Sequence, residues 1–222
     1  MGDFGYNTII WTIAIGTLII LGIFFLLKNK KDKINEQKGM DLGLGFFFIF
    51  YAICRMSFII SDYAENILLD NILMEYMWRL ATLFGLMGLT IMTFVIEFYI
   101  LEKKTKFIFS IIGVITIIIS VVGGSEIGRI AILYGPVAMG FIIIILYSYI
   151  AIKSSGYVRK RSLQALIGIL LFYSGITIDS NIISGFLNWM FGVETMLIRA
   201  IAAVILIIGV VIFGLSYKKT EE

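Results

Sequence analysis

Seven apolar stretches, separated by short polar segments, constrain the fold of this chain more than any other feature. A helix needs about 20 mostly apolar residues to cross a bilayer. Hydrophobic residues make up 60% of the chain, well above the roughly 45–50% apolar share of soluble domains. The sequence therefore predicts an all-α integral membrane protein, a single seven-helix bundle over residues 1–222. We expect spans at about 8–27, 43–61, 76–101, 107–123, 129–151, 163–186 and 195–216.

The polar segments between these spans alternate in charge. The segments after spans 1, 3 and 5 and the C-terminal tail carry five, three, four and two basic residues, whereas the segment after span 2 carries three acids and no base. Cytoplasmic segments of membrane proteins carry the excess of Lys and Arg. We therefore expect a multi-pass protein of the cell membrane with its N-terminus outside and its C-terminus in the cytoplasm.

Residue types that commonly carry catalysis are scarce. The chain has no histidine, and Cys54 is its sole cysteine. This excludes haem ligation by paired histidines, histidine-based zinc sites and Ser–His or Cys–His catalysis. We expect no enzymatic activity and no cofactor. The basic segments are typical of topology signals and of anionic-lipid contacts, so we expect the lipid bilayer, and no nucleic acid, as their partner.

Arginines inside or at the ends of the spans are the strongest pointer to function. Arg55 lies about three residues outward of the midpoint of span 2, and Asp179 about four residues outward of the midpoint of span 6, which is roughly 4–6 Å at 1.5 Å per residue. Charges near the centre of a bilayer are costly and usually pair inside the bundle. The sequence therefore predicts an ion pair between Arg55 and Asp179.

Other polar residues lie in the same outer half of the membrane and extend this prediction to a cluster. Arginine suits carboxylate and phosphate groups, so we expect the cluster to bind a small anionic or zwitterionic ligand. Two simpler interpretations stay open: hydroxyl groups that bond only to the backbone, and Arg79 paired with Glu75 one turn earlier. The candidate ligand-binding residues are Arg55, Arg79, Tyr173, Asp179, Asn181 and Arg199.

Span 3 carries a polar stripe, because polar residues recur in it at three- and four-residue steps and so share one helix face. A polar face inside a membrane contacts protein or water, so this one would line a path across the bilayer. Lysines 103, 104 and 106 near its inner end offer local pairing for Glu97 instead. Gly85 and Gly88 beside the stripe would let a second helix approach closely. The stripe runs from Arg79 through Thr82, Thr90 and Thr93 to Glu97.

Two further features concern helix shape and assembly. Pro136 removes a backbone donor inside span 5, which makes it the predicted hinge, or a bend that only shapes the bundle. Gly209 and Gly214 in span 7 are small residues that we place on an outer face of the bundle. Small residues let helices of two chains pack closely, so these glycines permit a homo-oligomer.

Four stretches are similar to the seven-helix membrane sensor regions of archaeal and bacterial signalling proteins: RMSFIISDYA, EYMWRLATLFGLMG, EFYILEKKTKFIFS and IKSSGYVRKRSLQALIG. The resemblance implies a stand-alone sensor module that signals to a separate cytoplasmic protein. It carries no functional residues over. The number of spans is also that of the microbial rhodopsins, but span 7 has no lysine that could hold retinal.

Three functions follow as expectations. The first is a receptor-like sensor that binds a small anionic or zwitterionic ligand at the outer cluster and signals to a cytoplasmic partner. The second is a small transporter or channel with its path along the stripe of span 3. The third is a non-catalytic structural or assembly subunit of a membrane complex.

Overall fold

The computed structural model describes residues 2–31, 35–101, 104–122 and 125–217, and every regular element in these ranges is helical. The all-α prediction is confirmed. The side chain of Asn181 lies outside the described part. The elements are α1 (Gly2–Lys31), α2 (Asn35–Tyr63), the π-helix η1 (Ala64–Leu68), α3 (Asn71–Val95), the π-helix η2 (Ile96–Ile100), α4 (Ile108–Val122), α5 (Ser125–Lys153), α6 (Gly156–Asp179), α7 (Asn181–Phe191) and α8 (Thr195–Ser216).

Six helical stretches of the described chain are long and apolar enough to cross a membrane. The apolar helix α4 is shorter, because its 15 residues reach about 22 Å at 1.5 Å per residue, less than the roughly 30 Å of the hydrocarbon core. These helices indicate a multi-pass membrane protein. The six stretches are Thr8–Asn29, Lys38–Leu68, Asn71–Ile100, Tyr134–Lys153, Gly156–Asp179 and Thr195–Ser216.

The chain divides into two compact units. One unit consists of residues 18–143, and the other of residues 1–17 together with residues 144–222. Helices α1 and α5 therefore contribute one part to each unit. We call the first the central unit and the second the terminal unit.

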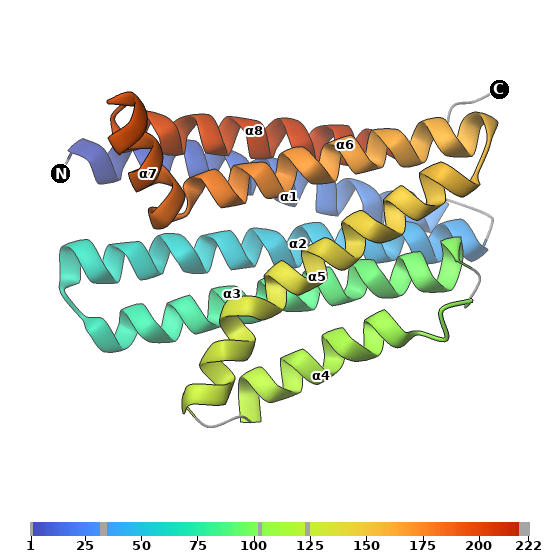
Figure 1. The fold of residues 1–222 in the computed structure, drawn as a ribbon, viewed down its shortest axis with the longest axis horizontal. Coiled ribbons are helices and arrows are strands. Elements are labelled where there is room, and N and C mark those ends of the chain that lie inside the picture. The colour runs from blue at the N-terminus through green and yellow to red at the C-terminus, as the bar shows by residue number, and fades with distance from the viewer. Residues whose placement is uncertain (1, 32–34, 102–103, 123–124, 218–222) are drawn as a thin grey trace. The chain divides into compact units, whose positions relative to one another are not determined.

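In the central unit, α2 and α3 form an antiparallel hairpin (Figure 1). The turn between them follows η1 and contains Leu69 in the left-handed region, at a φ of 53°. Asp70 then begins α3, because its carboxylate accepts two backbone N–H groups of the first turn, each at 3.0 Å. This arrangement is a side-chain cap, which satisfies donors that the helix itself leaves unpaired.

Small residues hold α2 and α3 close together. A Cβ atom at Gly43 would lie 2.0 Å from Cγ2 of Val95, and one at Gly85 would lie 3.3 Å from Sγ of Cys54. A Cβ atom at Gly88 would come within 3.4 Å of the α2 backbone. The prediction that Gly85 and Gly88 allow close approach of a helix is therefore confirmed, and the helix is α2.

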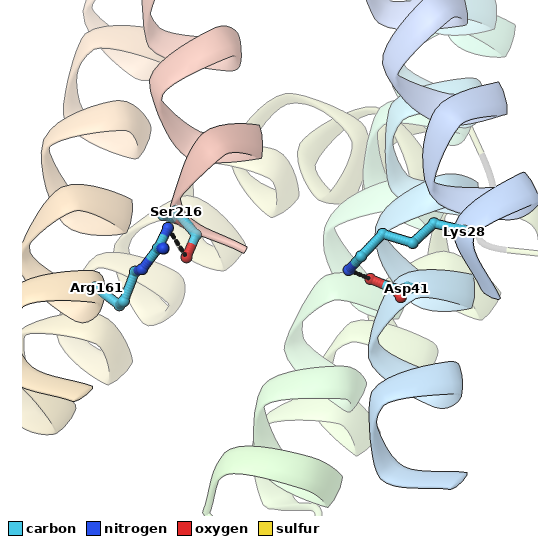
Figure 2. Close-up of polar contacts among 4 residues, drawn as sticks. All are labelled: Lys28, Asp41, Arg161 and Ser216. Atoms are coloured by element: carbon cyan, nitrogen blue, oxygen red, sulfur yellow. Dashed lines mark hydrogen bonds and ion pairs between the residues drawn. The ribbon is translucent and has the colours of Figure 1, made fainter. Parts of the chain in front are cut away.

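The second half of α1 packs against α2 in the same unit. A Cβ atom at Gly22 would lie 2.8 Å from the side chain of Ile49. Near the end of α1, Nζ of Lys28 forms an ion pair at 2.7 Å with Oδ1 of Asp41, whose side chain is only 2% exposed (Figure 2). The ion pair thus joins two consecutive helices through a half-buried lysine and a buried carboxylate.

Helix α4 contacts its neighbours through a narrow strip, and its other residues are mostly exposed apolar side chains. A Cβ atom at Gly113 would lie 2.5 Å from Oγ1 of Thr90 on α3, and one at Gly135 on α5 would lie 2.6 Å from Cγ2 of Thr116. The exposed residues suit contact with lipid. The buried residues of α4 are Ser110, Gly113 and Ser120.

Helix α5 continues through Pro136 without interruption. The side chain of this proline is half-buried. Its role as a hinge stays a prediction.

In the terminal unit, α6 and α8 lie side by side and antiparallel (Figure 1). Their backbones meet at two glycines. A Cβ atom at Gly168 would lie 2.8 Å from the carbonyl oxygen of Gly209, and one at Gly209 would lie 2.7 Å from that of Gly168. Gly209 and Gly214 are both buried. The prediction that they form an outer face for a second chain is wrong, because Gly209 is covered by α6 of the same chain.

The predicted span 163–186 is wrong as a continuous helix. α6 ends at Asp179, and Ser180 leaves the helix with a ψ of 140° before α7 begins. The Ser180 hydroxyl donates to the carbonyl oxygen of Thr177 at 2.7 Å, which satisfies an acceptor at the end of α6. Asp179 is therefore the last residue of its helix, and it does not lie near the midpoint of a span.

Candidate functional site

The six predicted ligand-binding residues are divided between the two units. Arg55 and Arg79 belong to the central unit, and the other four belong to the terminal unit. The guanidinium carbon of Arg55, a residue only 7% exposed, lies 6.0 Å and 5.9 Å from the ring centroids of Tyr51 and Phe58. Aromatic faces attract a cation at such distances. The ion pair of Arg55 with Asp179 stays a prediction.

Of the predicted residues in the terminal unit, two lie in the last turns of α6, one begins α7 and one lies in the first turns of α8. Tyr173, Asp179 and Arg199 are half-buried. The hydroxyl of Thr177, between two of them, donates to the carbonyl oxygen of Tyr173 at 2.8 Å. This hydroxyl bonds to its own backbone, as the simpler interpretation expected. The side chain of Asn181 lies outside the described part of the chain.

Arg79 forms an ion pair with Glu75 one turn earlier, with 2.6 Å between Nη2 and Oε1. The simpler interpretation of Arg79 is thereby confirmed. Both side chains are about half exposed, at 44% and 48%. Exposed pairs of this kind stabilise a protein by only about 0–1 kcal/mol, so the pair can separate at little cost.

An open cleft of about 570 Å³ lies between α3 and the end of α4. It forms where the shorter α4 stops at Val122 beside the longer α3. Polar side chains and apolar walls share its surface. Its lining residues are Asn71, Ile72, Glu75, Tyr76, Arg79, Leu80, Leu83, Ser120 and Val121.

The chemistry of this cleft combines one cation and one anion with an apolar wall. Arg79 offers a planar set of donors that matches a carboxylate or a phosphate. Glu75 offers an acceptor for an ammonium group. The Ser120 hydroxyl donates to the carbonyl oxygen of Thr116 at 2.7 Å. A small molecule with both charges and a modest apolar group fits these features.

The threonines of the predicted stripe are buried but bond within their own helix. The hydroxyls of Thr82, Thr90 and Thr93 each donate to the backbone carbonyl four residues earlier, at 2.8–2.9 Å. Threonine commonly makes this bond inside helices. A hydroxyl that donates to its own helix has no donor left for a passing solute.

Glu97 is buried and holds the start of another helix, a role that the sequence did not indicate. Its side chain is 0% exposed in η2, and its carboxylate accepts the backbone N–H groups of Phe109 at 3.2 Å and Ser110 at 2.8 Å. The Ser110 hydroxyl donates to the same carboxylate. Glu97 therefore caps the first turn of α4 from another helix. The predicted pairing of Glu97 with Lys103, Lys104 or Lys106 stays a prediction, and Lys103 lies outside the described part.

A second contact missed by the sequence prediction lies in the terminal unit. Nη1 of Arg161 donates to the carbonyl oxygen of Ser216 at the end of α8, at 3.3 Å (Figure 2), and to that of Leu215, at 2.7 Å. The last carbonyls of a helix lack donors from the helix's own next turn, so Arg161 supplies a donor at this end of α8. Nearby, the Tyr217 hydroxyl bonds with that of Tyr147, and burial raises the pKa of the Tyr217 phenol above its usual range. The basic residues of the segment that follows α5 thus include one, Arg161 in the first turns of α6, with a structural role.

Comparisons of the chain with protein-family models, with curated proteins and with solved structures each find no match. The resemblance to membrane sensor regions therefore stays an expectation from the sequence. What the protein does has to be inferred from its own residues and their geometry.

Proposed function

We propose that this chain is a receptor-like membrane sensor that binds a small anionic or zwitterionic ligand in the cleft between α3 and α4. Ligand binding is passed to a cytoplasmic partner protein. The observation that supports this proposal is the position of Arg79 and Glu75, both half-exposed, in an open cleft of about 570 Å³. Two opposite charges in such a cleft suit a small charged molecule better than an apolar one.

The proposed topology has seven spans, with the N-terminus outside. α4 makes the fourth crossing, and the bilayer thins locally or flanking residues extend to the interface, as short spans allow. The exposed Lys104 and Lys106 before α4 then lie in the cytoplasm, as do Arg159 and Lys160. The exposed residues of the turn between α2 and α3 include acids and no base. This turn, and the cleft beside it, then lie outside.

The proposed ligand replaces the ion pair between Arg79 and Glu75 by two ion pairs, one with each of these residues. Its carboxylate or phosphate takes the place of Glu75 beside Arg79, and its ammonium group, where it has one, takes the place of Arg79 beside Glu75. The cost is low because the existing pair is exposed. Leu80, Leu83 and Val121 supply the apolar wall for the rest of the molecule.

A transport path along α3 has less support. The threonine hydroxyls of the stripe donate to their own backbone, and Glu97 is enclosed as the cap of α4. The assembly-subunit function loses the surface expected at Gly209, which is covered by α6.

Thermal unfolding of the purified protein in detergent micelles tests the sensor. We would screen small carboxylates, phosphates and amino acids against the parent, Arg79→Gln, and Arg159→Gln as a matched control at an exposed arginine of the other unit. A ligand at 100 times its Kd stabilises the folded protein by about 2.7 kcal/mol. We expect a stabilising ligand for the parent and the control, and its loss in Arg79→Gln.

The opposite results are equally clear. A ligand that stabilises Arg79→Gln as much as the parent binds elsewhere, and the cleft is then not the site. If no compound of these three classes stabilises the parent, the proposed ligand chemistry is wrong. Glu75→Gln separates the two charges: a purely anionic ligand should bind it at least as well as the parent, and a zwitterion less well.

A further inference from the structure

The start of α4 is held by a buried carboxylate. Glu97 is 0% exposed and accepts two backbone N–H groups and one hydroxyl of the first turn of α4. Hydrogen bonds to an ionised acceptor are stronger than those between neutral groups. This set of bonds fixes where α4 begins along α3.

The turn that leads into α4 is strained. Lys106 and Phe107 are consecutive residues with positive φ, at 51° and 61°. Side chains other than glycine rarely take this conformation, and its cost is met by surrounding contacts. Here the ring of Phe107 stacks on that of Phe94, with centroids 5.6 Å apart, and also meets Phe98. The turn is therefore held in a costly conformation by the cap and by the rings.

The far end of α4 forms part of the ligand cleft. Ser120 and Val121 line the cleft, and they belong to the last turn of the same 15-residue helix that Glu97 caps. Between the two ends, the strip that contacts α3 and α5 consists of small residues, with Gly113 beside Thr90. A straight helix of this length would carry a displacement at its start to its end.

We propose that the Glu97 cap regulates the cleft, with α4 as the rigid connection between them. With the cap formed, Ser120 and Val121 take the position that gives the cleft its present shape. With the cap broken, the strained turn relaxes and the end of α4 shifts. That the cleft binds a ligand rests on the proposed function, whereas the coupling between cap and cleft does not.

Coupling between two sites acts in both directions. A ligand that favours one position of Val121 also favours one state of the cap, at the other end of α4. The change then appears at the turn that carries Lys104 and Lys106, where a partner protein can detect it. This gives the proposed sensor a route from one end of the α3–α4 pair to the other without a pore.

A fluorine NMR experiment without any ligand tests the coupling. A trifluoromethyl label is attached at Val121→Cys in a Cys54→Ala background, and its spectrum is compared with and without Glu97→Gln. Minor states of proteins are often populated at about 0.1–10%. We expect Glu97→Gln to raise the second state about tenfold, within the range usual for coupled sites, and so to add or shift a resonance.

The matched control is Thr93→Val, one turn earlier on α3 and equally buried at 0% exposed. Its hydroxyl bonds only to the Leu89 carbonyl, so this variant should keep the parent spectrum. Ser110→Ala removes one donor to Glu97 and should change the spectrum in the direction of Glu97→Gln, by less. If Glu97→Gln yields no folded protein, Ser110→Ala decides the question.

An unchanged spectrum in folded Glu97→Gln, or in Ser110→Ala where it decides, overturns the proposal, because the cap is then only structural. The same holds if Thr93→Val changes the spectrum as much as Glu97→Gln, since any loss of stability would then suffice. Because no ligand is present, these outcomes are independent of the ligand screen with Arg79→Gln. The ligand screen can thus contradict the sensor while the NMR experiment supports the coupling, and the reverse.

Discussion

Replacement of Gly209 by alanine should force α6 and α8 apart. The new Cβ atom would lie 2.5 Å from the backbone nitrogen of Phe172 and 2.7 Å from the carbonyl oxygen of Gly168. Both neighbours are backbone atoms, which cannot rotate away as the end of a side chain can. Carbon atoms are in favourable contact at about 3.5–4.0 Å, so the helices must separate by on the order of 1 Å.

The cost has two sources, weaker packing between the separated helices and crowding at the new methyl group. Each pair of touching atoms attracts by about 0.1–0.2 kcal/mol, and a gap of 0.5–1 Å removes about a quarter to a half of this attraction. Overpacking of a buried site costs about 1–3 kcal/mol in total, and alanine regains about 1 kcal/mol through its higher helix propensity. We therefore expect Gly209→Ala to lower the free energy of unfolding by up to about 2 kcal/mol.

The assay is unfolding by sodium dodecyl sulfate in mixed micelles, followed by far-ultraviolet circular dichroism. Gly16→Ala is the matched control, since a Cβ atom there meets nothing within 4 Å. It should leave the free energy of unfolding unchanged or raise it by up to about 1 kcal/mol. Equal or greater stability of Gly209→Ala than of Gly16→Ala would refute the close packing of α6 on α8.

Two further predictions concern the contacts of Figure 2 and use the same unfolding assay. Lys28→Met should cost about 3 kcal/mol because it leaves the buried Asp41 carboxylate without this cation, and Lys28→Met with Asp41→Leu should recover most of the loss; an additive loss would contradict the pairing. Arg161→Gln should cost about 1–2 kcal/mol by removing a charged donor from the end of α8, whereas Arg161→Lys should keep part of the stability. Arg159→Gln, at an exposed residue, is the control for Arg161→Gln and should stay close to the parent.

Patterns that depend on neighbours along one helix were predictable from the sequence. The periodicity of α3 placed Thr82, Thr90 and Thr93 on one buried face, because helical residues three or four apart share a face. The alternative pairing of Arg79 with Glu75 depended on the same spacing. The apolar stretches located the longer helices, although α1, α2 and α5 extend beyond the predicted spans at both ends.

Contacts between different helices were not predictable in this way. A local capping box is recognised by a Glu three residues after the cap residue of the same helix. Glu97 instead caps α4, which begins only after the following turn. Ser180 ends α6 without a proline or glycine, directly between Asp179 and Asn181. For Gly209, composition gave no guidance, because lipid and protein interior are equally apolar. The face of α8 that meets α6 is therefore not distinguished by hydrophobicity.

The ion pair between Lys28 and Asp41 has a consequence for the order in which the chain is made. The two residues are 13 positions apart, and a ribosome adds about 5–20 residues per second. Asp41 therefore emerges within about 1–3 s of Lys28, long before α3 has been synthesised. The timing thus allows each charge to meet its partner before α3 exists. The first two helices can thus be inserted as one hairpin whose charges are already neutralised, ahead of the rest of the protein.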